Sequence, residues 1–137
     1  MKFYAKYFTL ALMILASISF TACEKEEDEL DELDIEFKMD AGYTFADATL
    51  AAGTEVKVGI EAETEKAKDP IIRFTVSDAV NGAASATVYT ENLDNTDYEH
   101  DYIFTLQGDS GDTHLLTFTI TNRDGLVKQT SLTITVQ

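Results

Sequence analysis

Residues 114–136 read HLLTFTITNRDGLVKQTSLTITV, and this stretch decides the fold class. Apolar residues alternate with polar ones, mostly threonines, on both sides of the Asp124-Gly125 turn signal. A period of two is typical of a strand with one buried face and one wet face, as antiparallel sheets show. The stretch therefore predicts a β-hairpin made of residues 114–122 and 126–136.

The same alternation runs back along the chain to Leu33. It predicts further strands at residues 33–39, 55–62, 72–76 and 98–106. Turn signals separate these strands, namely Ala52-Gly53, Lys68-Asp69-Pro70, Asn81-Gly82 and the run from Gly108 to Asp112. No segment shows a convincing amphipathic helix. Six or seven strands in about 100 residues predict an all-β fold, an immunoglobulin-like antiparallel β-sandwich of about seven strands over residues 35–137.

Composition limits what this domain can bind. The chain has 25 acidic residues against 10 Lys and Arg, for a net charge of −15. Removing residues 1–22, whose only charged side chains are Lys2 and Lys6, would take the net charge to −17. Nucleic acids and anionic lipid head groups both need a cationic surface, so we expect neither as a partner. A single cysteine excludes an internal disulfide.

The N-terminus has the pattern of a secretion signal. Lys2 and Lys6 precede an uncharged run at residues 8–22, FTLALMILASISFTA. Fifteen residues of helix cover about 22 Å, which is short of the roughly 30 Å of a bilayer core. The run therefore predicts a cleaved signal peptide over residues 1–22.

The end of this signal resembles a lipobox, the cleavage motif of bacterial lipoproteins. The small residues Thr21 and Ala22 precede Cys23, although Phe20 stands where a leucine is usual. The resemblance implies that a peptidase cuts before Cys23, which then carries diacylglycerol and an N-acyl chain. Stable anchoring needs more than one acyl chain. We therefore expect Cys23 to be a membrane anchor and expect no other cofactor and no metal.

Residues 23–34 form an acidic linker, which reads EKEEDELDELD after the cysteine. Self-repulsion and the lack of apolar residues favour an extended spacer. Its first part resembles the export signal that sends lipoproteins of the Bacteroides and Flavobacterium group to the outer face of the outer membrane. The residues that carry this resemblance are Glu24, Lys25, Glu26, Glu27, Asp28 and Glu29. The alternative is a plain tether that faces the periplasm.

The remaining chain resembles small Ig-like lipoproteins of the same bacteria. The resemblance rests on Phe37 to Ala48 (FKMDAGYTFADA), on Gly53-Thr54-Glu55-Val56 and on the ending TFTITNRDGLVKQTSLTITV. The ending also resembles PKD and other bacterial Ig-like repeats. The resemblance implies the fold and a surface context, and it supplies no catalytic motif.

Two groups of residues offer candidate sites, one for a nucleophile and one for calcium. Gly108 to Asp112 reads GDSGD and resembles the segment around the nucleophile of chymotrypsin-like proteases, but a triad needs a histidine held close to Ser110. A polar turn is the favoured interpretation.

Asp109 and Asp112, with Glu99 or Asp101, offer hard oxygen ligands for calcium. No EF-hand-like spacing accompanies them, so a solvated loop is favoured.

Histidines and aromatic residues provide the last candidates. His100 and His114 are the only histidines, and a metal site needs three or four convergent ligands, so we interpret them as ordinary strand-end residues. Tyr43, Phe45 and Tyr89 lie in loop or edge contexts and offer a platform for a glycan. The chain has no tryptophan, and these rings are better interpreted as caps of the core.

The sequence thus predicts a lipid-anchored protein of the outer membrane that faces the cell exterior. Its Ig-like domain is expected to be a non-catalytic binding or adhesion module, with a protein or glycan ligand at its loops. Two alternatives stay open. One is a glycan-binding accessory of an outer-membrane uptake system, and the other is a calcium-stabilised adhesin module.

Overall fold

The computed structural model describes residues 32–137, so the signal peptide, Cys23 and the acidic residues 24–29 lie outside the described residues. The described part contains eight β-strands and no helix that is long and apolar enough to cross a membrane. The strands are β1 (Leu33–Phe37), β2 (Ala48–Leu50), β3 (Glu55–Thr64), β4 (Ile71–Val80), β5 (Ala86–Asn95), β6 (Asp97–Thr105), β7 (Thr113–Asn122) and β8 (Val127–Val136).

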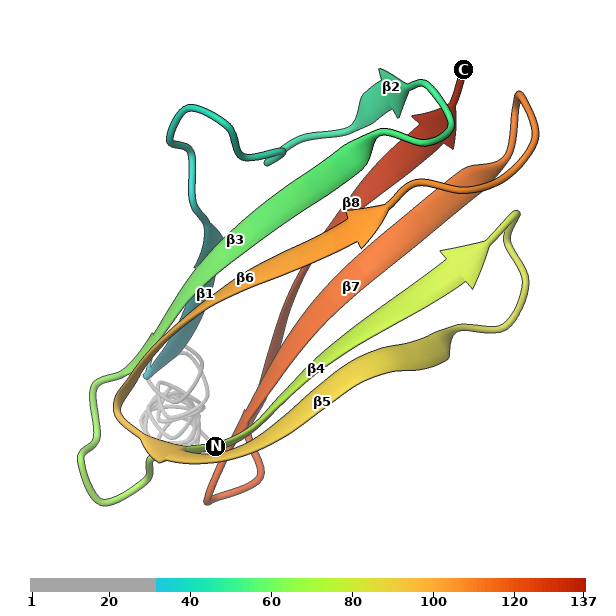
Figure 1. Cartoon of the computed structure of the whole chain (residues 1–137). Coiled ribbons are helices and arrows are strands. Elements are labelled where there is room, and N and C mark those ends of the chain that lie inside the picture. Colours follow the sequence, from blue (N-terminus) through green and yellow to red (C-terminus); the bar gives the residue numbers. More distant parts are fainter. Residues whose placement is uncertain (1–31) are drawn as a thin grey trace, which may run out of the picture.

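The strands form two layered sheets (Figure 1). One sheet has the order β1-β3-β6 and the other has the order β2-β8-β7-β4-β5. The pairings are antiparallel except that of β2 with β8. In immunoglobulin sandwiches strands B and E share one sheet, and strands G, F, C and C′ share the other. The orders found for β3-β6 and β8-β7-β4-β5 match this scheme, so the predicted immunoglobulin-like all-β sandwich is confirmed.

The structure adds two details to the prediction. The sandwich has eight strands where about seven are predicted, and the three-residue strand β2 and the edge strand β5 lack a strong apolar alternation in the sequence. The first strand begins at Leu33, where the predicted alternation also begins. Leu33 is buried and pairs with Thr64 at the end of β3, so it belongs to the sandwich and not to the acidic linker.

The core lies between the sheets and is made of inward residues from both. Phe74 of β4 and Phe118 of β7 are the largest fully buried side chains. Burying one such side chain contributes roughly 1.5–3 kcal/mol. The core residues are Leu33, Ile35, Val56, Val58, Ile60, Ala62, Ile71, Phe74, Val76, Leu106, Leu116, Phe118, Ile120, Leu132, Ile134 and Val136.

The two outer faces differ in charge. Two rows of outward carboxylates cross one end of the sheet of β1, β3 and β6, and we call these residues the acidic face: Asp34, Glu36, Glu61, Glu63, Asp97 and Glu99. Like charges directly opposite one another on neighbouring strands are destabilising. The outward residues of β4, β7 and β8 are mostly threonine and serine, and we call them the threonine face: Arg73, Thr75, Ser77, Ala79, Thr113, Leu115, Thr117, Thr119, Thr121, Val127, Gln129, Ser131, Thr133 and Thr135.

Candidate functional site

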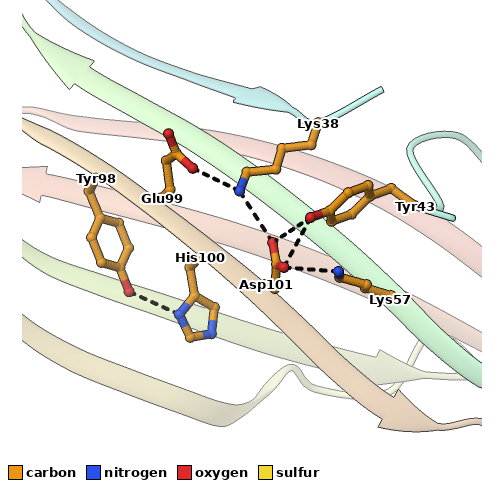
Figure 2. Close-up of polar contacts among 7 residues, drawn as sticks. All are labelled: Lys38, Tyr43, Lys57, Tyr98, Glu99, His100 and Asp101. Atoms are coloured by element: carbon orange, nitrogen blue, oxygen red, sulfur yellow. Dashed lines mark hydrogen bonds and ion pairs between the residues drawn. The ribbon is translucent and has the colours of Figure 1, made fainter. Parts of the chain in front are cut away.

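Strand β6 carries two polar clusters, one on each of its faces (Figure 2). Successive side chains of a strand point to opposite faces. Glu99 and Asp101 therefore point outward. Tyr98 and His100 lie opposite the buried residues Ala62 and Ile60 of β3, and they point between the sheets.

The outward cluster joins β6 to the segment that follows β1. The Nζ atom of Lys38 lies 2.9 Å from Glu99 Oε2 and 3.3 Å from Asp101 Oδ1, and Lys57 Nζ lies 3.1 Å from Asp101 Oδ2. The hydroxyl of Tyr43 donates to the same carboxylate at 3.0–3.1 Å. We call Lys38, Tyr43, Lys57, Glu99 and Asp101 the Lys38 cluster.

Charge in the Lys38 cluster is balanced internally. Hydrogen bonds to Glu99 and to Asp101 raise the pKa of Lys38 and of Lys57, respectively, above the usual value for lysine. The bond from Lys57 holds the pKa of Asp101 below its usual value. Both amines therefore stay protonated, and an ammonium group has no lone pair with which to act as a nucleophile.

Gly59 makes room for this cluster. A Cβ atom at this position would lie 2.5 Å from Tyr43 Cε1 and 2.7 Å from Lys38 Cδ. Lys57 Nζ lies 4.3 Å from the centroid of the Tyr43 ring, within the range of a cation–π contact. The ring is thus held against β3 by a glycine, an ammonium group and a carboxylate.

The substitution Gly59→Ala is expected to lower the free energy of unfolding by about 1–3 kcal/mol, the usual cost of overpacking. The added methyl group would force the Tyr43 ring off the sheet and break its bonds to Asp101. Urea denaturation measures the loss. In a Tyr43→Ala background the obstructing ring is gone, so the same glycine substitution should cost much less. An equal cost in both backgrounds would contradict this account.

The inward cluster closes the side of the sandwich where β5 and β6 are both edge strands. Tyr98 and Tyr89 each donate a hydrogen bond to Oε2 of Glu91, at 2.5 and 2.9 Å. Tyr98 has only one proton, so Nδ1 of His100, 3.1 Å from its oxygen, must be the donor in that contact. The neutral ring of His100 therefore carries its proton on Nδ1. We call Tyr89, Glu91, Tyr98 and His100 the Tyr98 cluster.

Aromatic contacts place the Tyr98 cluster on the core. The His100 ring lies 4.6 Å from that of Tyr89 and 5.1 Å from that of Phe74. Burial and the bond to Glu91 raise the pKa of Tyr98, while the two tyrosine bonds lower the pKa of Glu91. Burial lowers the pKa of His100. The cluster therefore combines a charged carboxylate with neutral rings.

His114 lies elsewhere, at the start of β7. Its Nδ1 is 2.8 Å from Asp78 Oδ2, and its Nε2 is 2.9 Å from the carbonyl oxygen of Gln107. Both partners are acceptors, so both bonds form only when the ring is an imidazolium. Burial lowers the pKa of His114, but the bonds to Asp78 and Gln107 outweigh it, and the net pKa is raised.

The pKa of His100 is expected to lie below the usual value of 6.5, and the pKa of His114 is expected to lie above it. Below pH 6.5 the unfolded chain protonates its His100 more readily than the folded chain, so stability falls as the pH drops. Above pH 6.5 the folded chain keeps the proton on His114 that the unfolded chain loses. That contribution is fully present below 6.5 and disappears as the pH rises through the folded pKa. An NMR titration of both rings checks this, and midpoints in the reverse order would contradict it.

The structure separates the residues that the protease and calcium hypotheses require. Gly108 to Asp112 forms the turn between β6 and β7, where Asp112 accepts bonds from Asn81 Nδ2 and from the Asp109 amide. Glu99 and Asp101 instead belong to the Lys38 cluster. Both nitrogens of His114 are engaged, so neither is left to accept a proton from Ser110. Within residues 32–137 no three His, Cys, Asp or Glu side chains are arranged to hold a metal ion.

The proposed aromatic platform is also divided. Tyr43 lies on the outer face of β3, whereas Tyr89 packs against His100 at the edge between the sheets. Phe45 is 43% exposed.

The two histidines lie in different sheets, because β6 pairs with β3 whereas β7 pairs with β4 and β8.

Sequence reasoning missed Lys38, Lys57 and Glu91, which complete the two clusters. It also missed Asp78, which bonds His114, and Asn81, which bonds Asp112. Lys38 and Lys57 follow the outward alternation of their strands, and that alternation was the available signal. Glu91 lies in β5, which was not predicted, and Asp78 meets His114 only through the register of β4 with β7. Strand register sets these contacts, and it is not visible in the alternation alone.

Comparisons with known proteins give matches only among solved structures. No protein-family model matches the chain, and no curated protein matches it. Among solved structures, the superoxide reductase (neelaredoxin) from Ignicoccus hospitalis is 10% identical with a TM-score of 0.49, over 77% of this chain and 80% of that one. The sporulation control protein Spo0M from Bacillus subtilis is 14% identical with a TM-score of 0.42, over 77% of this chain and 49% of that one. The chain thus spans about half the length of Spo0M. Neither likeness carries an argument about function.

Proposed function

We propose that this protein is a lipid-anchored, surface-displayed envelope protein whose Ig-like domain is a non-catalytic interaction module. The resemblance to small Ig-like lipoproteins of the Bacteroides and Flavobacterium group stays a prediction, and it supports the anchoring part through Cys23 and the acidic run after it.

One observation carries the interaction part of the proposal. Among the described residues, Lys38 and Lys57 pair with Asp101, and His114 pairs with Asp78. A protonated lysine is not a nucleophile, and an imidazolium whose two N–H groups are hydrogen-bonded cannot act as a general base. The remaining surface consists of two sheet faces and short loops, which suits binding to another surface.

The loops far from the anchor are well ordered by backbone bonds. The turns after β2, β4 and β6 lie at one end of the sandwich with the C-terminus, and the start of β1 lies at the other end (Figure 1). The Gly53 amide donates to Leu106, and the Gly111 amide donates to Val136. Such preorganised loops lose little entropy on binding. This supports a ligand at the end away from the membrane.

The test is the accessibility of the domain on intact cells. We expect a protease or an antibody to reach the wild-type domain, and to reach it far less when Glu24, Glu26, Glu27, Asp28 and Glu29 are replaced by alanine. The matched control replaces Glu61 and Glu63, acids of the folded domain, and should stay accessible. Shielding of the wild-type domain would contradict surface display and would leave the acidic run as a spacer.

A further inference from the structure

The threonine face is nearly free of charge, unlike the rest of this acidic domain. The register places Thr75, Thr119 and Gln129 in one row across β4, β7 and β8, and Ser77, Thr117 and Ser131 in the next. Among the paired outward positions of these three described strands, Arg73 is the charged side chain. Depletion of charge is the compositional mark of the centre of a protein interface.

Apolar side chains lie on the same face. Leu115 is 42% exposed opposite Ala79 and Thr133, and Val127 is 52% exposed opposite Thr121. Hydroxyl groups around them both donate and accept hydrogen bonds. The Thr75 and Thr90 hydroxyls already lie 3.4 Å apart, and Gln129 donates to Thr119. Such a face is complementary to a copy of itself.

We propose that the threonine face is a self-association surface, on which a second copy of this chain packs face to face. Each mature copy would carry a net charge of −17, and the acidic face of one copy would repel that of any other. The threonine face is where two copies can approach without that repulsion. A two-fold contact places the same patch on both partners, as a self-complementary surface requires.

The size of the face fits a weak interface between copies. Its three strands, β4, β7 and β8, have ten residues each. At about 4.8 Å between strands and about 3.3 Å per residue, they cover roughly 480 Å² per copy. Two copies would bury about 950 Å², the size of a weak or transient interface.

The membrane anchor favours this contact, and this step rests on the proposed function. Aligned sheet packing with a two-fold axis along the strands brings the start of β1 in both copies to the same end. Both lipid anchors then enter one membrane. Tethering raises the effective concentration of the partners, so a weak contact suffices.

Thiol cross-linking of the full lipidated chain in membranes tests the proposal. Cys23 is the only native cysteine, so Thr119→Cys adds one reactive thiol at the centre of the threonine face. Glu61→Cys, at the centre of the acidic face, is the matched control. We expect severalfold more bismaleimide dimer from Thr119→Cys. Raising the ionic strength from about 0.01 M to about 0.15 M shortens the Debye length from about 30 Å to about 8 Å and should increase the dimer further.

A charge placed on the face should abolish the dimer. In the Thr119→Cys background, Thr117→Glu is expected to remove the cross-link, whereas Thr105→Glu, on the outer face of the other sheet, should retain it. Equal cross-linking of Thr119→Cys and Glu61→Cys overturns the proposal, as does cross-linking of Thr119→Cys to a different protein alone. If the chain is found in the soluble fraction, the anchoring is wrong, and the same two cysteine variants compared in solution still decide self-association.

Discussion

Replacing Phe118 by alanine is expected to lower the free energy of unfolding by about 3–5 kcal/mol. Phe118 has no exposed surface, and its ring packs 5.7 Å from Phe37 and 6.2 Å from Tyr102, both in the opposite sheet. It also stacks on Phe74, in its own sheet, at 6.4 Å. Removing the ring leaves a cavity that both sheets line. The total free energy of unfolding of a domain of this size is about 5–15 kcal/mol, so the variant should lose a large part of its stability.

Urea denaturation of the mature chain, followed by circular dichroism, measures this loss. The neighbouring Thr119→Ala is the matched control, because Thr119 sits on the same strand and points to the outer face. Its expected cost is below about 1 kcal/mol, the span of β-propensity. A similar midpoint shift for both variants would mean that the alternation of β7 does not define the core.

The alternation of apolar residues predicted the strands that build the core. The predicted hairpin of residues 114–122 and 126–136 corresponds to β7 and β8, whose register joins Leu116 to Leu132. Each predicted strand buries a row of aliphatic or aromatic side chains on one face, and burial is what makes the period of two visible. The turn signals also hold, since Asn81 and Gly82 both have positive φ.

Two strands gave no such signal. β2 has three residues, too few for an alternation, and it is held by parallel pairing with β8. β5 is an edge strand whose side chains are exposed or half-buried, with a register shift opposite Val76 and Ser77. A strand that buries little has no need of apolar residues at every second position. Its length and place depend on β4, which the local sequence does not encode.

The candidate sites depended on which strands share a sheet. His100 packs on Phe74 of the facing sheet, whereas His114 lies six positions further along β4, opposite Val80, so the two histidines do not meet. Residue types alone suggested calcium ligation by Asp101, but the register sets it opposite Gly59 and next to two lysines. The charge of the chain was evident from its composition. Its separation into an acidic face and a threonine face follows from the pairing of strands.

Replacing Cys23 by alanine is expected to remove all covalently bound fatty acid from the protein. Each buried methylene contributes about 0.8 kcal/mol to membrane binding, and one acyl chain gives only reversible attachment. A diacylglycerol together with an N-acyl chain on Cys23 would therefore be a stable anchor. The substitution removes the thiol to which the lipid is attached, and it also removes the residue before which the lipobox peptidase cuts.

Metabolic labelling with an alkyne fatty acid and mass spectrometry of the purified protein measure both effects. The wild-type chain should carry the label and should begin at Cys23. The Cys23→Ala chain should carry no label, and its N-terminus should lie at a position other than residue 23. Replacing Phe20 by leucine, which restores the usual lipobox residue, should leave labelling intact or increase it. An unlabelled wild-type chain cut at another position would mean that residues 1–22 are an ordinary secretion signal. The acidic residues after Cys23 would then not follow a lipid anchor, and surface display would require a different attachment to the membrane.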